Sequence, residues 1–268
     1  MLTAAGAREV AASPGAFLFD LDGTLYTDAG PIPGAVEALA ALRRRGVPLR
    51  CVTNTTRRSR RLLAARLAGY GFAIEAQDII TAVMSGVGLL RARGVRRVAA
   101  YVVPETLEDF AGFDLAGTPP EAVVIGDLGE AWDFATLNRA FHSLMEGAEL
   151  LALQRDRYWL KDDALALDAG PFVAALEYAT GKTAMVCGKP SGAFYQAALA
   201  TLPAAVSSRP RDVVMVGDDL WGDVEGAQQA GLTAWMVRTG KFRDDVVAAS
   251  GITPDRIVNS VAELPELF

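Results

Sequence analysis

Short runs of apolar residues alternate along the chain with segments in which apolar residues recur every three or four positions. The first run, Ala16 to Phe19, lies between Pro14-Gly15 and Asp22-Gly23. A continuous apolar run bounded by turn residues is typical of a buried strand in a parallel sheet. The alternation of such strands with helical segments predicts an α/β protein, in which helices cover a parallel sheet.

The two ends of the chain are expected to form one doubly wound parallel sheet, because each end contains strand-like runs separated by helical patterns. Gly231 is positioned to end the last of these helices. The expected strands of this sheet cover residues 16–19, 47–53, 212–217, 232–237 and 256–258, and the expected helices cover residues 34–46, 59–69 and 223–230.

The middle of the chain contains a second series of elements. A stretch of roughly a hundred residues is too long for a loop of a compact domain and can hold a core of its own. We therefore predict a Rossmann-like catalytic core formed by residues 1–80 and 183–268, and an inserted α/β cap domain formed by residues 81–182. The expected strands of the cap cover residues 98–103, 122–125, 150–153 and 165–167, and its helices cover residues 82–93, 134–146 and 171–180.

Composition narrows the class of protein. Of the 268 residues, 51% are hydrophobic and 22% are charged, which is typical of a globular chain. The formal net charge of −6 argues against nucleic acid or an anionic membrane as the main partner. No apolar run approaches the roughly twenty residues of a membrane span, and Arg8 and Glu9 interrupt the Ala-rich start. We therefore expect a cytoplasmic protein with no membrane partner.

Histidine and cysteine are too scarce for the sites that depend on them. Cys51 and Cys187 are the only cysteines, so a disulfide framework or a Cys-rich zinc site is not expected. The single histidine, His142, lies in a segment with apolar residues at helical spacing, which favours a structural role. Those apolar residues are Phe134, Leu137, Phe141 and Leu144.

Carboxylates follow two of the expected strands. Asp20 and Asp22 end the first apolar run, and Gly217-Asp218-Asp219 ends the run at 212–217, with Asp223 four residues later. An Asp-Gly pair alone is equally consistent with an ordinary turn. Neighbouring parallel strands would bring these acids to one sheet edge, where they repel one another unless a cation binds. Oxygen ligands without His or Cys favour Mg²⁺.

Two further polar motifs occur at comparable positions. Thr53-Asn54 follows an expected strand, and Gly188-Lys189-Pro190-Ser191 precedes a helix. A hydroxyl and an ammonium group suit the oxygens of a transferring phosphoryl group. The basic run at residues 57–61 is read as a solvated face, with attraction of an anionic substrate as the alternative. Gly126-Asp127 resembles the metal motif but is assigned to a turn in the cap.

Taken in order, the motifs D-x-D-G-T, T-N, G-K-P and G-D-D-x-x-x-D resemble the haloacid dehalogenase superfamily of phosphotransferases. The cap between the second and third motifs resembles the class IIA, NagD-like branch. Longer stretches look most like the subfamily of phospholysine phosphohistidine inorganic pyrophosphate phosphatase. They include the runs Leu167 to Phe172, Ala175 to Ala179 and Val237 to Phe242, and the resemblance covers nearly everything from Ala16 to Val258.

The resemblance implies roles for the motif residues. Asp20 is expected to be the nucleophile that forms an aspartyl phosphate, and Asp22 the general acid and base. Thr53 and Asn54 are expected to bind the phosphoryl group together with Lys189. A Mg²⁺ cofactor is expected on Asp20, the backbone carbonyl of Asp22 and Asp218, with Asp219 and Asp223 in its outer shell.

Asp168 has two readings. It precedes a predicted helix, where an aspartate commonly caps the first turn. By resemblance, the loop that contains Asp168 faces the catalytic centre and helps to select the leaving group.

The expected activity is hydrolysis of a small phosphorylated metabolite by a Mg²⁺-dependent phosphatase. The alternatives are action on N–P or P–O–P bonds, and, from another class, a catalytically silent protein that binds phosphorylated ligands. Analogy with the family also implies a homodimer that pairs through the cap.

Overall fold

The computed structural model describes residues 14–161 and 164–267, which fold into two compact units. The first unit comprises the described residues up to Val52, Leu67–Ala73, and the chain from Ala198 onward. The second unit comprises Thr53–Arg66 and Ile74–Ala197. The division of the chain into a core and a cap at residues 81–182 stays a prediction.

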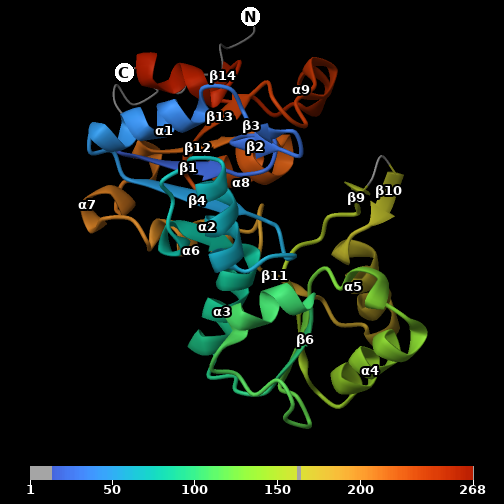
Figure 1. Cartoon of the computed structure of the whole chain (residues 1–268). Coiled ribbons are helices and arrows are strands. Elements are labelled where there is room, and N and C mark those ends of the chain that lie inside the picture. Colours follow the sequence, from blue (N-terminus) through green and yellow to red (C-terminus); the bar gives the residue numbers. More distant parts are fainter. Residues whose placement is uncertain (1–13, 162–163, 268) are drawn as a thin grey trace, which may run out of the picture. The chain divides into compact units, whose positions relative to one another are not determined.

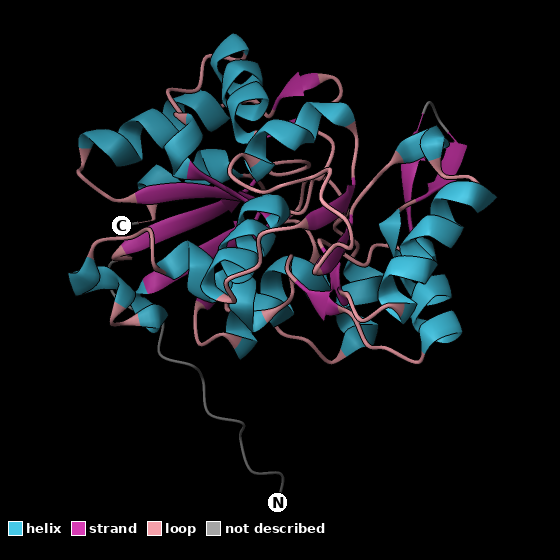
Figure 2. Ribbon diagram, turned by 90° about the horizontal axis from the view of Figure 1, so that it is seen from below, coloured by secondary structure: helices cyan, strands magenta, loops and turns pink. Residues whose placement is uncertain are grey.

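The first unit contains the expected parallel sheet, whose strands follow the order β14-β13-β12-β1-β4. Every neighbouring pair in this order is parallel. Segments from the two ends of the chain thus lie side by side (Figure 1), and helices lie on both sides of the strands (Figure 2). The doubly wound α/β fold is confirmed. The strands are β1 (Ala16–Asp20), β4 (Leu49–Thr53), β12 (Val213–Gly217), β13 (Thr233–Val237) and β14 (Arg256–Val258).

Strand β1 lies between β12 and β4, and all five of its residues are buried. The rings of Phe17 and Phe19 stack at 5.5 Å, and the Phe17 ring meets Trp235 of β13 edge-on at 6.0 Å. A short ribbon of β2 (Tyr26–Thr27) and β3 (Gly30–Pro31) follows β1. The helical elements of this unit are α1 (Ala35–Arg44), α7 (Ala204–Ser207), η4 (Pro210–Asp212), the π-helical turn η5 (Leu220–Glu225), α8 (Gly226–Gln229), α9 (Asp244–Ser250) and η6 (Val261–Glu266).

The second unit contains a parallel sheet of its own, in the order β11-β8-β7-β6. Alternate residues of β7 enter two different hydrophobic clusters, Ala122 and Val124 in one, Val123 and Ile125 in the other. Both faces of the sheet are therefore covered, which explains the unbroken apolar run at this strand. Its strands are β6 (Val98–Tyr101), β7 (Ala122–Ile125), β8 (Glu149–Ala152) and β11 (Met185–Val186).

An antiparallel hairpin extends the second unit, formed by β9 (Tyr158–Lys161) and β10 (Ala164–Leu167). The sequence predicted only the second of these strands. Two helices contain residues of both units, namely α2 (Arg60–Gly69) and α6 (Gly192–Leu199). The remaining elements of the second unit are η1 (Ala76–Asp78), β5 (Ile79–Thr81), α3 (Ala82–Ala92), η2 (Pro104–Phe110), η3 (Gly129–Ala131), α4 (Phe134–Met145) and α5 (Ala169–Thr180).

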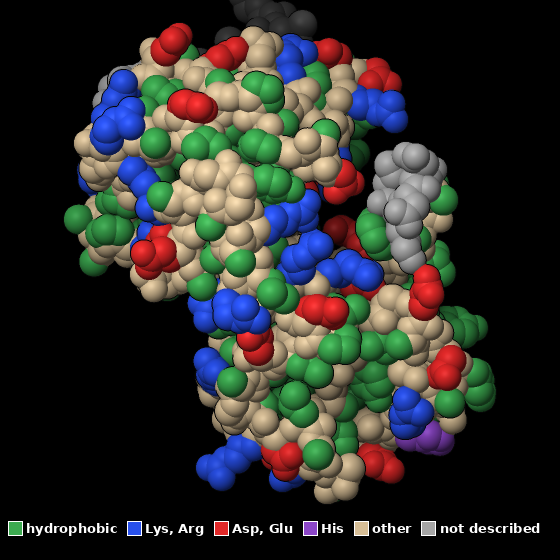
Figure 3. Space-filling view, viewed as in Figure 1, with side chains coloured by type: hydrophobic (Ala, Val, Ile, Leu, Met, Phe, Trp, Pro, Cys, Tyr) green, Lys and Arg blue, Asp and Glu red, His purple; other side chains and the backbone are tan. Residues whose placement is uncertain are grey.

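Helix α4 departs from its expected packing at its first turn. Leu144 is buried, and Leu137 and Phe141 pack against the core, but the side chain of Phe134 is 83% exposed. Phe134 is the first residue of the helix, so its side chain lies at the end of the apolar stripe. His142 lies on the exposed face, where Nε2 is 3.1 Å from the Asn138 amide nitrogen, and Figure 3 shows this histidine at the surface.

No helix within residues 14–161 and 164–267 is both long enough and apolar enough to cross a membrane.

Candidate functional site

Three predicted carboxylates meet at one edge of the sheet in the first unit. Asp20 is the last residue of β1, and Asp218 directly follows β12. Because β1 and β12 pair in parallel, with Phe19 opposite Val216, their carboxyl ends lie side by side. Together with Asp223, these residues offer one oxygen each, all within 4.8 Å of one another.

The environment of these carboxylates favours a cation. All three side chains are buried. Burial raises the pKa of Asp218 to about 8, and repulsion by Asp20 and Asp223 contributes to that rise. A hydrogen bond from the Lys241 backbone N–H opposes the rise in pKa. A donor set made only of carboxylate oxygens suits a hard divalent cation such as Mg²⁺.

The Asp218 carboxylate is held between two glycines in the left-handed conformation, Gly23 at φ +80° and Gly240 at φ +63°. A Cβ atom at Gly23 would lie 2.2 Å from Asp218 Oδ2, which is closer than real Cβ atoms approach an oxygen. The Lys241 backbone N–H donates to the same Oδ2 at 2.7 Å. Close approach of the backbone on both sides therefore fixes the position of this carboxylate.

Glycine also makes room for Asp223, because a Cβ atom at Gly217 would lie 2.1 Å from Asp223 Oδ2. That oxygen accepts the Asp219 backbone N–H at 3.1 Å. The Asp219 side chain caps the turn η5 by accepting from Trp221 N at 3.0 Å and Gly222 N at 2.8 Å. Asp219 therefore helps to hold the loop, while Asp223 joins the carboxylate cluster.

Asp22 lies outside the cluster of three. Its side chain is exposed, two residues beyond Asp20. Gly23 turns the chain at φ +80°, and its N–H donates to Tyr26 O at 2.7 Å. The turn predicted at Asp22-Gly23 is present, and Asp22 forms an isolated bridge with Tyr26 beyond the end of β1.

The structure brings two other motifs together in the second unit. The Asn54 side chain accepts from Lys189 N at 2.7 Å and donates to Lys189 O at 3.0 Å. A Cβ atom at Gly188 would lie 2.5 Å from Asn54 Oδ1, so this bridge needs glycine there. Lys189 and Thr53 are both buried, and Thr53 Oγ1 accepts from Thr55 N at 3.0 Å. Asn54 thus ties the T-N motif to the G-K-P motif.

Asp168 caps helix α5, as the sequence predicted for its structural role. Its Oδ1 accepts the Ala169 backbone N–H at 2.7 Å and also bonds the Gln154 amide. Burial raises the pKa of Asp168 to about 6. A part in leaving-group selection stays a prediction.

Comparison with known proteins decides the family. The family model described as haloacid dehalogenase-like hydrolase matches residues 17–116, and a related HAD-hydrolase-like model matches residues 186–264. Haloacid dehalogenase-like hydrolase domain-containing protein 2 of Rattus norvegicus is 42% identical over 228 residues, which make up 85% of each chain. This chain belongs to the haloacid dehalogenase-like hydrolase family.

Other relatives place the chain among the phosphatases of the family. Human phospholysine phosphohistidine inorganic pyrophosphate phosphatase is 37% identical and covers 94% of this chain and 93% of its own. NagD from Escherichia coli K-12 matches with a TM-score of 0.84 at 26% identity, covering 94% and 98%. Glycerol phosphate phosphatase from Mycobacterium tuberculosis, solved with magnesium, matches with a TM-score of 0.82 at 30% identity, covering 94% and 76%. The predicted resemblance to NagD-like phosphatases of the haloacid dehalogenase family is confirmed.

Several contacts of this family member were not predicted from its sequence. The Lys241 side chain donates to Asp219 Oδ2 at 2.8 Å, although the run Val237 to Phe242 was noted only for its resemblance. Arg57 Nη1 donates to Asp127 Oδ2 at 2.6 Å, and Asp127 Oδ1 accepts Gly129 N at 2.6 Å. The turn assigned to Asp127 is therefore present, and it also holds an ion pair.

Proposed function

We propose that this protein is a Mg²⁺-dependent phosphatase that hydrolyses small phosphorylated metabolites through an aspartyl phosphate on Asp20. The observation that carries the proposal is the cluster of Asp20, Asp218 and Asp223, whose ligand oxygens lie within 4.8 Å of one another. Membership of the haloacid dehalogenase-like family supports the same chemistry.

Hydrolysis would proceed in two steps. In the first, an Asp20 carboxylate oxygen forms a bond to phosphorus, and the bond to the leaving oxygen breaks as Asp22 transfers a proton to that oxygen. In the second, Asp22 takes a proton from water, and the water oxygen replaces Asp20 on phosphorus. Inorganic phosphate leaves and both carboxyl groups return to their starting states. The exposed side chain of Asp22 is accessible to a leaving group and to water.

The cation would be held by the side chains of Asp20 and Asp218 and by the backbone carbonyl of Asp22, with Asp219 and Asp223 supporting its shell. When bound, Mg²⁺ would offset the negative charge of the phosphoryl group and of the buried acids. The acid cluster fits this requirement, because burial, together with repulsion by Asp20 and Asp223, raises the pKa of Asp218.

Phosphoryl binding is assigned to Thr53, Asn54 and Lys189. A buried hydroxyl and a buried ammonium group provide donors for phosphoryl oxygens. The hydrogen bonds of Asn54 to the Lys189 backbone support a shared role, because they fix the positions of the two motifs.

We assign residues 81–182 to a cap that selects the leaving group, with Asp168 as one of its contributors. A homodimer formed through the cap and a cytoplasmic location belong to the same proposal. A second candidate activity is cleavage of N–P or P–O–P bonds, favoured by 37% identity to a relative named as a phospholysine, phosphohistidine and pyrophosphate phosphatase.

The test is phosphate release with and without Mg²⁺ across sugar phosphates, nucleotides, aryl phosphates, pyrophosphate and phosphoramidates. We expect activity to vanish on chelation and to return with Mg²⁺. Asp20→Asn should abolish turnover while keeping the circular dichroism spectrum of the wild type. The matched control is Asp245→Asn, at an exposed aspartate of the same unit, which should remain fully active.

Three outcomes separate the candidates. Faster release from pyrophosphate or phosphoramidates than from every monoester would favour the second activity. Binding of phosphorylated ligands without any hydrolysis would show a silent binding protein instead. Substantial Mg²⁺-dependent activity in folded Asp20→Asn would overturn the mechanism.

A further inference from the structure

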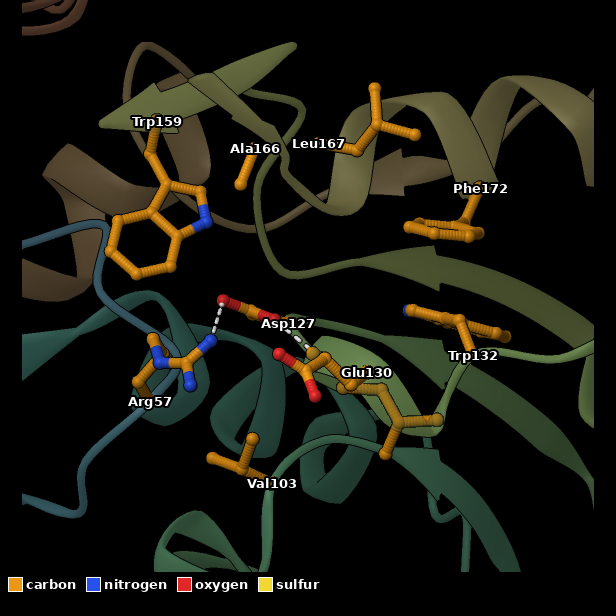
Figure 4. Close-up of a pocket in the computed structure, with 11 residues that line it drawn as sticks. Arg57, Val103, Asp127, Glu130, Trp132, Trp159, Ala166, Leu167 and Phe172 are labelled. Atoms are coloured by element: carbon orange, nitrogen blue, oxygen red, sulfur yellow. Dashed lines mark hydrogen bonds and ion pairs between the residues drawn. The ribbon is translucent and has the colours of Figure 1, made fainter. Parts of the chain in front are cut away.

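The second unit contains a pocket of about 460 Å³, within the roughly 300–1,000 Å³ typical of small-molecule sites. We call it the aromatic pocket, because three aromatic side chains contribute to its walls. Figure 4 shows Trp159 on one side and the pair Trp132 and Phe172 on the other, with polar side chains between them. All the residues that line the pocket belong to the second unit.

The wall made by Trp132 and Phe172 is a flat stacked pair. Their ring centroids lie 4.5 Å apart at an interplanar angle of 12°. Tyr101 also stacks on Trp132, at 5.6 Å, so both faces of the Trp132 ring are covered and the ring is held in place. Figure 4 shows the edges of Trp132 and Phe172 directed toward the pocket, and aromatic edges of this kind favour the face of a ligand ring in an edge-to-face contact.

The opposite wall is formed by Trp159, whose ring contacts the Arg57 side chain. The Arg57 guanidinium lies 5.1 Å from the centroid of the Trp159 ring and pairs with Asp127 at 2.6 Å. Asp127 is buried and accepts the Gly129 N–H with its other oxygen. Arg57 therefore contacts one face of the Trp159 ring, while its own charge is matched by Asp127.

The polar groups of the pocket disfavour an anionic occupant. Its described charged residues are Arg57, Asp127 and Glu130, and the first two form an ion pair. Glu130 is exposed and adds a further negative charge. The indole N–H of Trp132 is buried and has no hydrogen-bond partner among the described residues. Figure 4 shows the nitrogen-bearing edge of Trp132 directed toward the middle of the pocket.

The aromatic pocket shares a loop with the proposed phosphoryl-binding residues. Asp127 N donates to Thr56 Oγ1 at 2.9 Å, and Thr106 Oγ1 donates to Thr56 O at 2.7 Å. Thr53 lies three residues before Thr56, a span of at most about 10 Å of extended chain. A phosphoryl group at Thr53 and a ring in the pocket could therefore belong to one small molecule.

We propose that the aromatic pocket binds the leaving group, and that it selects a planar aromatic group that is neutral or cationic. This inference rests on the proposed phosphatase function. The reaction at phosphorus is the one proposed above, and the pocket determines only which leaving group is preferred. Trp159 is the specificity-determining residue, since its ring forms one wall and lies opposite Ala166 across the hairpin β9–β10.

The first test compares benzyl phosphate with cyclohexylmethyl phosphate, which are similar in size and leaving-group chemistry. We expect kcat/KM to favour benzyl phosphate about three- to tenfold, the contribution of one aromatic contact. Trp159→Leu should remove this preference, whereas Trp159→Phe should retain it. The matched control is Tyr158→Leu, at the neighbouring aromatic residue, which does not line the pocket and is 57% exposed.

The second test varies charge with benzyl phosphates that carry a para-carboxylate or a para-aminomethyl group. We expect the aminomethyl compound to be the better substrate, and Glu130→Gln to reduce the ratio of the two kcat/KM values at least twofold. These substrates and Glu130→Gln test the inference even if Trp159→Leu fails to fold.

Failure of the inference can be distinguished from failure of the proposed function. If no phosphate ester is hydrolysed, the proposed function is wrong. If benzyl and cyclohexylmethyl phosphates are hydrolysed equally well, the phosphatase function stands and the aromatic preference is overturned. A preference that survives Trp159→Leu would overturn the assignment of Trp159.

Discussion

A Cβ atom at Gly240 would lie 1.9 Å from Oδ2 of Asp218, closer than any real Cβ atom approaches an oxygen. Gly240 also has a φ of +63°, which L side chains rarely adopt. The next residue, Lys241, donates its backbone N–H to the same oxygen at 2.7 Å. The loop that follows β13 thereby positions a carboxylate that we assign to the cation.

We predict that Gly240→Ala weakens Mg²⁺ binding. The added methyl group must displace either the loop or the Asp218 carboxylate. Changes in the groups that orient a metal ligand commonly cost about 10- to 100-fold in affinity. The Mg²⁺ concentration for half-maximal activity should rise accordingly, and the Mg²⁺-induced increase in Tm should shrink.

Gly251→Ala is the matched control for the backbone strain of this substitution. Gly251 has a φ of +75°, but a Cβ atom there would meet nothing within 4 Å. Both variants should lose about 1–2 kcal/mol of stability from the left-handed conformation. Only Gly240→Ala should change the Mg²⁺ requirement, so equal Mg²⁺ dependence in the two variants would contradict the role of Gly240.

The bridge from Asn54 to Lys189 yields a second prediction. Asn54→Ala removes two hydrogen bonds and leaves the Lys189 N–H and C=O without these partners. We expect a loss of about 2 kcal/mol in the free energy of unfolding by urea. The loss of kcat should be larger than that of a surface variant, because Lys189 would no longer be held in place.

Asn138→Ala serves as the control, since Asn138 makes an exposed hydrogen bond to His142. It should change stability by less than about 0.5 kcal/mol and leave kcat unchanged. A loss of kcat for Asn54→Ala no greater than that for Asn138→Ala would show that the bridge is not needed for catalysis.

The sequence predicted the parallel sheet of the first unit because burial of β1 on both faces produces an unbroken apolar run from Ala16. The convergence of Asp20 and Asp218 followed from the same pattern, since both end neighbouring parallel strands. Local patterns of this kind need no knowledge of distant contacts.

Other features depended on contacts between residues far apart in sequence. The first strand of the hairpin, β9, has no alternation of apolar and polar residues that would mark it. Arg57 and Asp127 are 70 positions apart, and the basic run around Arg57 gave no sign of its acidic partner. The support of Asp218 by Gly240 depends on a close backbone approach. A glycine permits such an approach, but its presence in the sequence does not show which side chain will lie next to it.

Both cysteines are predicted to be unreactive. Burial raises the pKa of Cys187 to about 12, so almost none of its thiol is ionised at neutral pH. Cys51 is also fully buried. We expect no modification of the native protein by iodoacetamide at pH 8, and two modified residues after denaturation, as measured by mass spectrometry. Rapid labelling of the native protein would contradict the observed burial.

The caps of two helices should respond to pH in opposite directions. Asp168 has its pKa raised by burial to about 6, so the folded protein keeps this proton over a range where the unfolded chain has lost it. Its contribution to stability is full below about pH 4 and is lost as the pH rises through 6. Compared with wild type, Asp168→Asn should therefore gain about 1–3 kcal/mol between pH 4 and pH 7. Asp133 caps α4, and the backbone N–H of Thr136 lowers its pKa below that of the unfolded chain. The advantage of wild type over Asp133→Asn should therefore be full above about pH 4 and be lost as the pH falls below that value. Urea unfolding of the three proteins at about pH 2.5, 4 and 7 checks both signs. Parallel pH curves for the two variants would contradict the raised pKa of Asp168.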